Sequence, residues 1–426
     1  MRAALWFIAL FGVAVAVALF AGNNQGTITV FWPPYRIDLS LNLVLLLLLG
    51  GFTLVHLALR ALAALLDLPV QAGRWRSQQE ERAMHVALLD GLSHLTAGRF
   101  IRARKAAEAA IAHEKALVGS AEPLAHAVQV RALAHLIAAE SAHSLQDRTA
   151  RDRHMQQALE QTATNPSAPA QEAREGAQLR AASWALQDRD APAALAWLEQ
   201  LPQGAARRTM ALRTRLRATR LAQQTQPALD TARLLIKHRA FTPSAAHSIV
   251  RGLAVELINQ AHDVSQLLAL WQSLDANERG MPELAVHAAE RLRLLGGDAT
   301  LARSWLLPAW ETLVDTPGSL ADTLEIKLVR ALEGSLSDVD PQWLARIETA
   351  QQQNPREPLL QYLAGIACLR LQLWGKAQKL LEQASTTLPH DALRCRAWRA
   401  LATLAEQRGD GEAAARAWRR AAELSD

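Results

Sequence analysis

Apolar and polar residues divide the chain into two unequal parts. The first part holds two long apolar runs, Ala3–Gly22 and Leu39–Leu59; the former has no charged residue, and the latter is interrupted by polar side chains at only a few positions. Each run is about 20 residues long, which at 1.5 Å per residue is enough to cross a hydrocarbon core of ~30 Å. The sequence therefore predicts two transmembrane helices, at about 3–22 and 39–59, within a membrane hairpin over residues 1–66.

A cleaved signal peptide is the alternative for the first run, since Arg2 precedes it and small residues end it near Ala21. Signal cores are usually roughly 7–15 residues long, and this run is longer, which favours a retained span. The loop at 23–38 contains two extended stretches, Thr27–Trp32 and Tyr35–Leu39, separated by two prolines. This pattern predicts a small β-hairpin between the two spans.

Basic residues near the ends of the spans predict the orientation of the hairpin. Arg2 precedes the first span and the loop at 23–38 carries only Arg36, whereas four arginines follow the second span: Arg60, Arg74, Arg76 and Arg82. Because Lys and Arg concentrate on the cytoplasmic side of membrane proteins, we expect both termini to be cytoplasmic and the short loop to lie outside.

The second part of the chain shows a repeat at tetratricopeptide (TPR) spacing, in which each unit of roughly 34 residues forms two antiparallel helices. If Gly365 is the small residue of a first helix, the small, large, small and proline positions expected after it are Ala377, Leu381, Ala384 and Pro389. The same twelve-residue step joins Ala402 to Ala414 and Gly91 to Ala103. The agreement of three distant units favours a TPR-like array.

Between these units, proline and glycine breaks still divide the sequence into helix pairs. The predicted pairs are 124–163, 169–200, 205–238, 243–274, 282–314 and 318–353. Together with the clearer units they give about nine helix pairs over 85–426, preceded by a juxtamembrane helix or linker at 67–84. Because each pair buries its apolar face only against its neighbours, we predict an all-α, TPR-like α-solenoid.

Composition agrees with the all-α class and excludes several functions. The chain is rich in helix formers, and at 50% apolar residues it is too hydrophobic for a disordered protein. Two cysteines, Cys368 and Cys395, are too few for a disulfide framework or a four-cysteine zinc site. The sequence has no GxGxxG motif after a strand and no HExxH, GxSxG or CxxC motif. We therefore expect no catalytic residues, no resident metal and no enzymatic activity.

Three histidines are the candidate ligand-binding residues. His135 and His143 are eight residues apart, which we interpret as about the same face of one helix, and His154 follows in the next helix. Neutral imidazoles bind metals and haem iron, so His135, His143 and His154 are candidate cofactor-binding residues. The alternative is that they are ordinary solvated histidines of repeat helices.

The formal net charge of +5 is modest for 426 residues, but one predicted helix is markedly basic. Its arginines are Arg207, Arg208, Arg213, Arg215, Arg217 and Arg220. Nucleic acid is one interpretation. Acidic residues elsewhere and the membrane anchor favour instead a surface for a partner protein, for anionic lipid headgroups or for a carboxylated tetrapyrrole. We expect no nucleic-acid partner.

The layout resembles the HemY family, TPR inner-membrane proteins associated with haem biosynthesis in proteobacteria. The resemblance rests on the loop GNNQGTITVFWPPYRIDLS (22–40) between two spans, on the first repeat ALLDGLSHLTAGRFIRARKAA (87–107) and on LIAAESAH (136–143). The units at 358–424 are similar too, as they are in other TPR proteins. The flavoprotein protoporphyrinogen oxidase of the same name is a different protein, which requires a dinucleotide-binding fold that this sequence does not predict.

The resemblance implies a non-catalytic scaffold or carrier in the bacterial inner membrane, with both termini and the repeats in the cytoplasm. It implies a late step of protohaem synthesis, terminal haem-biosynthesis enzymes as partners, and haem or a porphyrin as a ligand of the repeat groove. The alternative is an envelope assembly chaperone of another pathway, of the cytochrome c maturation or lipopolysaccharide regulation type.

Overall fold

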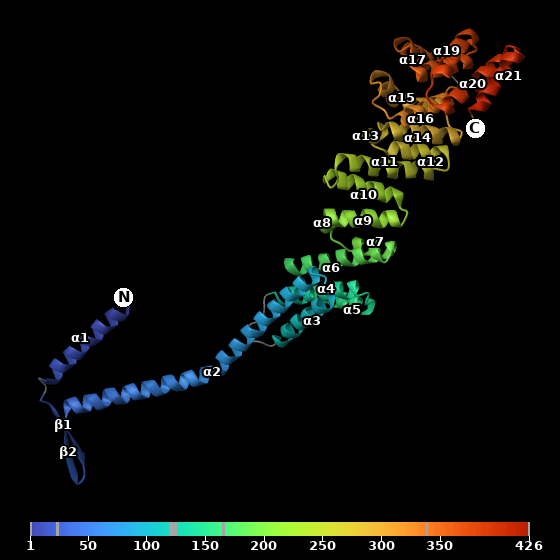
Figure 1. The fold of residues 1–426 in the computed structure, drawn as a ribbon. Helices are drawn as coiled ribbons and strands as arrows, with labels where there is room; N and C mark the ends of the chain where they lie inside the picture. The colour runs from blue at the N-terminus through green and yellow to red at the C-terminus, as the bar shows by residue number, and fades with distance from the viewer. Residues whose placement is uncertain (1, 23–24, 119–125, 164–166, 338–339, 425–426) are drawn as a thin grey trace. The chain divides into compact units, whose positions relative to one another are not determined.

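The chain forms two compact units, Met1–Ala173 and Arg174–Asp426, in a computed structural model. The structure describes residues 2–22, 25–118, 126–163, 167–337 and 340–424; for 2–5, 7–10, 20–21 and 67–70 it describes the backbone alone. Apart from one short hairpin, the described elements are helices, as Figure 1 shows. The all-α prediction is confirmed.

The first unit begins with helix α1 (Arg2–Gly22) and the antiparallel strands β1 (Thr27–Trp32) and β2 (Tyr35–Ser40). The strands pair from Thr27 opposite Ser40 to Trp32 opposite Tyr35, so the two prolines occupy the turn between them. The predicted β-hairpin is thus confirmed. Ser40 then caps the next helix, because its hydroxyl accepts a hydrogen bond from the Leu43 N–H at 3.3 Å.

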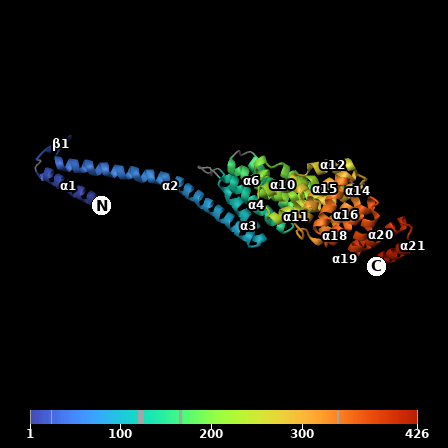
Figure 2. The ribbon, with the colours of Figure 1, turned by 90° about the horizontal axis from the view of Figure 1, so that it is seen from above.

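Helix α2 (Leu41–Thr96) is continuous from the predicted second span into the first repeat. Its apolar part has a mean hydropathy of 2.2 and is not buried, so by length and composition it is suited to cross a membrane. Among the described residues it is the one helix that meets this test. The first predicted span coincides with α1, but several of its side chains lie outside the described residues, so the two-span hairpin remains a prediction. The segment 67–84 is not a separate element but part of α2 (Figure 2).

The end of α2 pairs with α3 (Phe100–Ala116), and α4 (Ala127–Ser144) pairs with α5 (Arg148–Ala163). The first pair crosses at Gly91, where an added Cβ atom would lie 3.5 Å from the Ala107 backbone nitrogen and 3.6 Å from the Ala103 carbonyl oxygen. Ala103 and Ala107 are themselves fully buried. The predicted TPR spacing is therefore realised as close helix packing.

The remaining helices continue the same alternation. Helix α6 (Ala168–Gln187) contains the boundary between the two units, and α7 (Ala191–Glu199) follows it. The later elements are α8 (Gln203–Ala206), α9 (Thr209–Leu221), α10 (Thr225–Lys237), α11 (Pro243–Gln260), α12 (Val264–Ser273), α13 (Ala276–Arg279), α14 (Pro282–Leu294), α15 (Ala299–Asp315), α16 (Asp322–Ser335), α17 (Pro341–Gln353), α18 (Pro358–Arg370), α19 (Trp374–Thr387), α20 (Asp391–Gln407) and α21 (Gly411–Glu423).

Leaving out α1 and the four-residue helices α8 and α13, the described residues form nine helix pairs, and the six pairs predicted between 124 and 353 agree with the observed helices. Within the second unit, the first helix of a pair also contacts the first helix of the next, as α14 does with α16 and α16 with α18 (Figure 2). This arrangement is typical of TPR-like stacks, in which neighbouring pairs share one apolar core.

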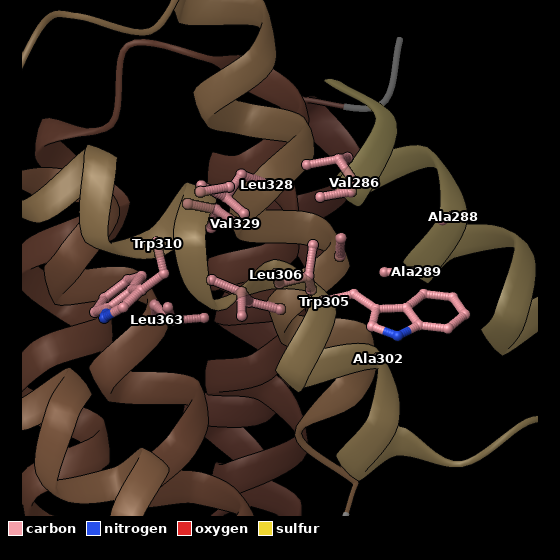
Figure 3. Close-up of a cluster of buried hydrophobic side chains, with 14 of the residues drawn as sticks. Val286, Ala288, Ala289, Ala302, Trp305, Leu306, Trp310, Leu328, Val329 and Leu363 are labelled. Carbon is pink, nitrogen blue, oxygen red and sulfur yellow. The ribbon is translucent and has the colours of Figure 1, made fainter. Parts of the chain in front are cut away.

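The core of the second unit extends through its stacked pairs, with leucine and alanine filling most of it. Tryptophans fill the wider spaces: Trp271 stacks on Trp305 with ring centroids 4.6 Å apart, and Trp310 lies 6.2 Å from Trp343. Figure 3 shows Trp305 and Trp310 on either side of Leu306. Aromatic side chains of this size bury large apolar areas, so they hold successive helices together.

Candidate functional site

Two of the three candidate histidines meet inside one helix pair. His135 on α4 and His154 on α5 place their Nδ1 atoms 3.0 Å apart, with ring centroids at 5.3 Å. The two residues are only 6% and 5% exposed. The alternative of solvated histidines is therefore wrong for this pair, which forms a polar contact within the core of the repeat.

Burial keeps both rings neutral at physiological pH. Desolvation, together with smaller contributions from the charges of His154, Lys115 and Arg131, lowers the pKa of His135 to about 4. Desolvation also lowers the pKa of His154, while the nearby Glu108 carboxylate opposes this shift. Since two neutral rings share one proton between facing nitrogens, one Nδ1 donates and the other accepts. The pair is thus a structural hydrogen bond whose nitrogen lone pairs are largely shielded from solvent.

His143 lies apart from this pair, at the C-terminal end of α4. Its Nδ1 atom is 3.3 Å from an Arg151 guanidinium nitrogen, and its side chain is partly exposed. Eight residues of an α-helix advance by about 2.2 turns, so the rings of His135 and His143 are rotated by roughly 80° about the helix axis. The interpretation that they share one face is wrong for this reason.

A buried ion pair fixes the helices around the histidines. The Arg131 guanidinium on α4 donates two hydrogen bonds to the Glu114 carboxylate on α3, one of them at 2.6 Å from Nε, and a third to Gln161 on α5 at 2.8 Å. Glu114 is 2% exposed. A bidentate contact of this kind has a fixed geometry, so it holds α3, α4 and α5 in register. This ion pair was not predicted, because its residues lie on different helices.

A second histidine pair, also not predicted, joins α2 to the beginning of α4. His85 and His126 face each other with their Nε2 atoms 3.1 Å apart, and Glu81 lies one helical turn before His85. The i, i+4 spacing of Glu81 and His85 is visible in the sequence, and residues so spaced share a helix face. The approach of His126, 41 residues later, depends on how α4 packs against α2.

Four of the six arginines predicted on one basic helix lie on α9, whereas Arg207 and Arg208 precede it. Arg208, which precedes α9, pairs with the Glu175 carboxylate at 2.9 Å, and Arg213 donates to the Ala240 carbonyl oxygen at 2.9 Å. Arg213, Arg217 and Arg220 are exposed and lie on one face at i, i+4 and i+7. They form a short basic stripe, a surface suited to anionic groups.

Residues 26–146 match a family model described as the HemY protein N-terminus. The matched stretch includes the β-hairpin, α2, α3 and α4, together with both histidine pairs except His154. The resemblance to the HemY family is thus confirmed over this stretch.

No curated protein matches the chain. Solved structures with some likeness include Naa15/Naa10 bound to HypK-THB (12% identity, 76% of this chain and 56% of that chain, TM-score 0.25). Another is the APC/C hetero-tetramer Cut9–Hcn1 (13% identity, 84% of this chain and 69% of that chain, TM-score 0.26). A third is the TPR domain of P58(IPK) (17% identity, 76% of this chain and 99% of that chain, TM-score 0.23). At these TM-scores the likeness identifies neither a partner nor a ligand.

Proposed function

Because residues 26–146 carry a HemY-type N-terminal region, we propose that this protein is a non-catalytic, membrane-anchored scaffold or carrier for a late step of haem biosynthesis. The observation that carries the proposal is that the matched region contains both an apolar, unburied helix segment and the first TPR-like pair, joined without a break in α2. A protein built in this way keeps its repeats beside a membrane. Terminal haem-biosynthesis enzymes are the proposed partners.

For the anchor, we propose the bacterial inner membrane, with α1 and the apolar part of α2 as two spans. The division into a hairpin at 1–66, a juxtamembrane segment at 67–84 and repeats at 85–426 belongs to this proposal. Large apolar side chains along the first part of α2, such as Leu47 and Phe52, are 61% and 73% exposed, a pattern suited to lipid. Both termini then lie in the cytoplasm. The topology is tested by fusing, after Asp426, a reporter that is active only outside the cytoplasm. Activity of that fusion would contradict a cytoplasmic C-terminus.

For the mechanism, the repeats raise the local concentration of partner enzymes at the membrane without making or breaking bonds themselves. Stacked helix pairs commonly hold a peptide or helix of a partner in a groove. For a tetrapyrrole ligand, the basic stripe of Arg213, Arg217 and Arg220 is suited to its carboxylates. Among the three candidate histidines, His143 is the one whose ring solvent reaches most readily.

The carrier and scaffold versions are separated by titrating the full-length protein, reconstituted in nanodiscs, with haemin and with protoporphyrin. Saturable, stoichiometric binding with a defined Soret shift supports a carrier, and its loss in Arg217→Gln or His143→Gln locates the ligand. Binding that never saturates contradicts the carrier version and favours the scaffold version. The scaffold version then predicts that the repeats can be crosslinked to terminal haem enzymes.

The anchor is tested in cells with a chain that lacks residues 3–59. We expect this truncated protein to be stable but unable to support haem synthesis, because the repeats no longer lie at the membrane. Full complementation by the truncated chain would contradict the proposal.

A further inference from the structure

Three side chains with metal-binding atoms converge where α2 passes the start of α4. They are Glu81 and His85 on α2 and His126 immediately before α4, and their ligand atoms all lie within 4.8 Å of one another. The Nε2 atoms of His85 and His126 are 3.1 Å apart. Two nitrogens bound to one tetrahedral ion at about 2.0–2.1 Å are roughly 3.3 Å apart, so the imidazole pair already has the spacing of two ligands.

The hydrogen bond on the far side of His85 defines which of its nitrogens is available. Its Nδ1 atom lies 2.8 Å from the Glu81 carbonyl oxygen, an atom that only accepts, so Nδ1 carries the proton. In the neutral ring the lone pair is then on Nε2, which faces His126. Metal-binding histidines usually donate their second N–H to a carbonyl or carboxylate in this way, which fixes both tautomer and ring orientation.

We propose that Glu81, His85 and His126 form a binding site for a divalent transition-metal ion. Two imidazole nitrogens and one carboxylate oxygen suit zinc and its neighbours in the first transition row, whereas Mg²⁺ and Ca²⁺ prefer oxygen ligands alone. Because Glu81 precedes His85 by one turn, rotation of its side chain brings a carboxylate oxygen to the same ion. A fourth coordination position is left for water or for a ligand donated by another molecule.

The neighbouring contacts support this position for an ion. Glu80 pairs with His113 on α3 at 2.7 Å, so α2 is already joined to α3 by a carboxylate–imidazole contact beside the site. An ion bound by His85 and His126 joins α2 to α4 as well. The site therefore connects the helix that leaves the apolar segment to the second helix pair. It is independent of the proposed role in haem synthesis.

The test uses the full-length protein in detergent micelles, purified with a tag that contains no histidine. Zn²⁺ is titrated by calorimetry with excess Mg²⁺ present, and Co²⁺ replaces it for absorption spectroscopy. We expect one high-affinity ion per chain and visible Co²⁺ bands of a four- or five-coordinate site. His85→Gln, His126→Gln and Glu81→Gln should each weaken Zn²⁺ binding at least tenfold. His94→Gln, about two and a half turns further along α2, is the matched control and should leave it unchanged.

Circular dichroism of each variant separates loss of a ligand from loss of the fold, and any one folded ligand variant is sufficient for the comparison. The proposal is overturned if the wild-type protein shows no saturable Zn²⁺ binding near one equivalent, or if folded His85→Gln and His126→Gln bind as wild type does. Equal weakening in His94→Gln would also overturn it. None of these measurements involves haem, so they are distinct from the tests of the proposed function.

Discussion

Gly365 on α18 lies directly against Leu381 on α19: a Cβ atom at residue 365 would be 2.7 Å from the Cγ atom of Leu381. Leu381 is fully buried and has no room to withdraw. We expect Gly365→Ala to lower the free energy of unfolding by about 1–2 kcal/mol, because the steric strain exceeds the gain in helix propensity. Urea unfolding followed by far-UV circular dichroism measures this change.

The matched control is Gly375→Ala on α19, where an added Cβ atom would meet nothing within 4 Å. It should be neutral or stabilise the protein by up to about 1 kcal/mol, since alanine favours the helix. Equal changes in the stability of the two variants would contradict the close packing of α18 against α19 at Gly365.

The turn between the two helices of a pair repeatedly uses a left-handed backbone conformation. Gln146, Gln223 and Gln372 have φ of 60°, 57° and 60°, and Gly98 and Gly409 hold the equivalent positions at 70° and 75°. Side chains disfavour this region, so Gln372→Gly should stabilise the second unit by roughly 0.5–1 kcal/mol. Thermal unfolding measures the change. The reverse substitution, Gly409→Gln, should destabilise by a similar amount, and a gain there would contradict the prediction.

The buried histidine pair makes stability depend on pH. The pKa of His135 is lowered from 6.5 to about 4 in the folded chain, so between these values the unfolded chain binds a proton that the folded chain does not. The contribution of His135 to the free energy of unfolding is therefore complete above about pH 6.5. It is lost as the pH falls toward 4, and the loss is of order 2–3 kcal/mol. Unfolding midpoints at pH 7.5 and 5 measure the loss.

The double variant His135→Leu with His154→Leu removes both partners of the contact, so it should unfold with a weaker dependence on pH in this range. His143→Gln is the control and should retain the wild-type dependence, because His143 lies outside the pair. An unchanged pH dependence in the double variant would assign the effect to other groups.

The ion pair of Arg131 with Glu114 should be essential to the first helix pairs. Replacing Arg131 with Met leaves the Glu114 carboxylate, 2% exposed, without its counterion, and we expect a loss of about 3 kcal/mol. Arg416→Met is the matched control, because Arg416 and its partner Glu412 have side chains that are 68% and 91% exposed. That change should alter stability by less than about 0.5 kcal/mol. Hydrogen exchange in α3 and α4 locates the effect.

The helix pairs could be predicted because their signals are local. Proline at the first turn begins α11, α14, α17 and α18, and small residues at fixed spacing mark the crossings, as Gly365 does. The β-hairpin was equally readable from two extended stretches around two prolines. One helix boundary was not: residues 60–84 contain Pro69 and Gly73, which disfavour a helix, yet α2 continues through the predicted linker.

The candidate site was only partly predictable because its contacts join different helices. His135 and His154 were identified as residues, but their contact depends on which faces of α4 and α5 turn inward. The pairing of His85 with His126 spans 41 residues and depends on the packing of α4 against α2. Spacing along the chain contains no such information unless both residues lie on one helix, as Glu81 and His85 do.

Helix α2 is a continuous spacer of defined length, in which Pro69 lacks the backbone N–H donor of an ordinary helical residue. Its 56 residues extend roughly 84 Å at 1.5 Å each, so in the proposed topology the part of α2 after the second span limits how far the first helix pair can lie from the bilayer. Inserting one residue between 60 and 80 would turn that pair by about 100° about the helix axis and raise it by only about 1.5 Å. Inserting seven would raise it by about 10 Å with almost no rotation, so the two insertions separate the effect of reach from the effect of facing direction.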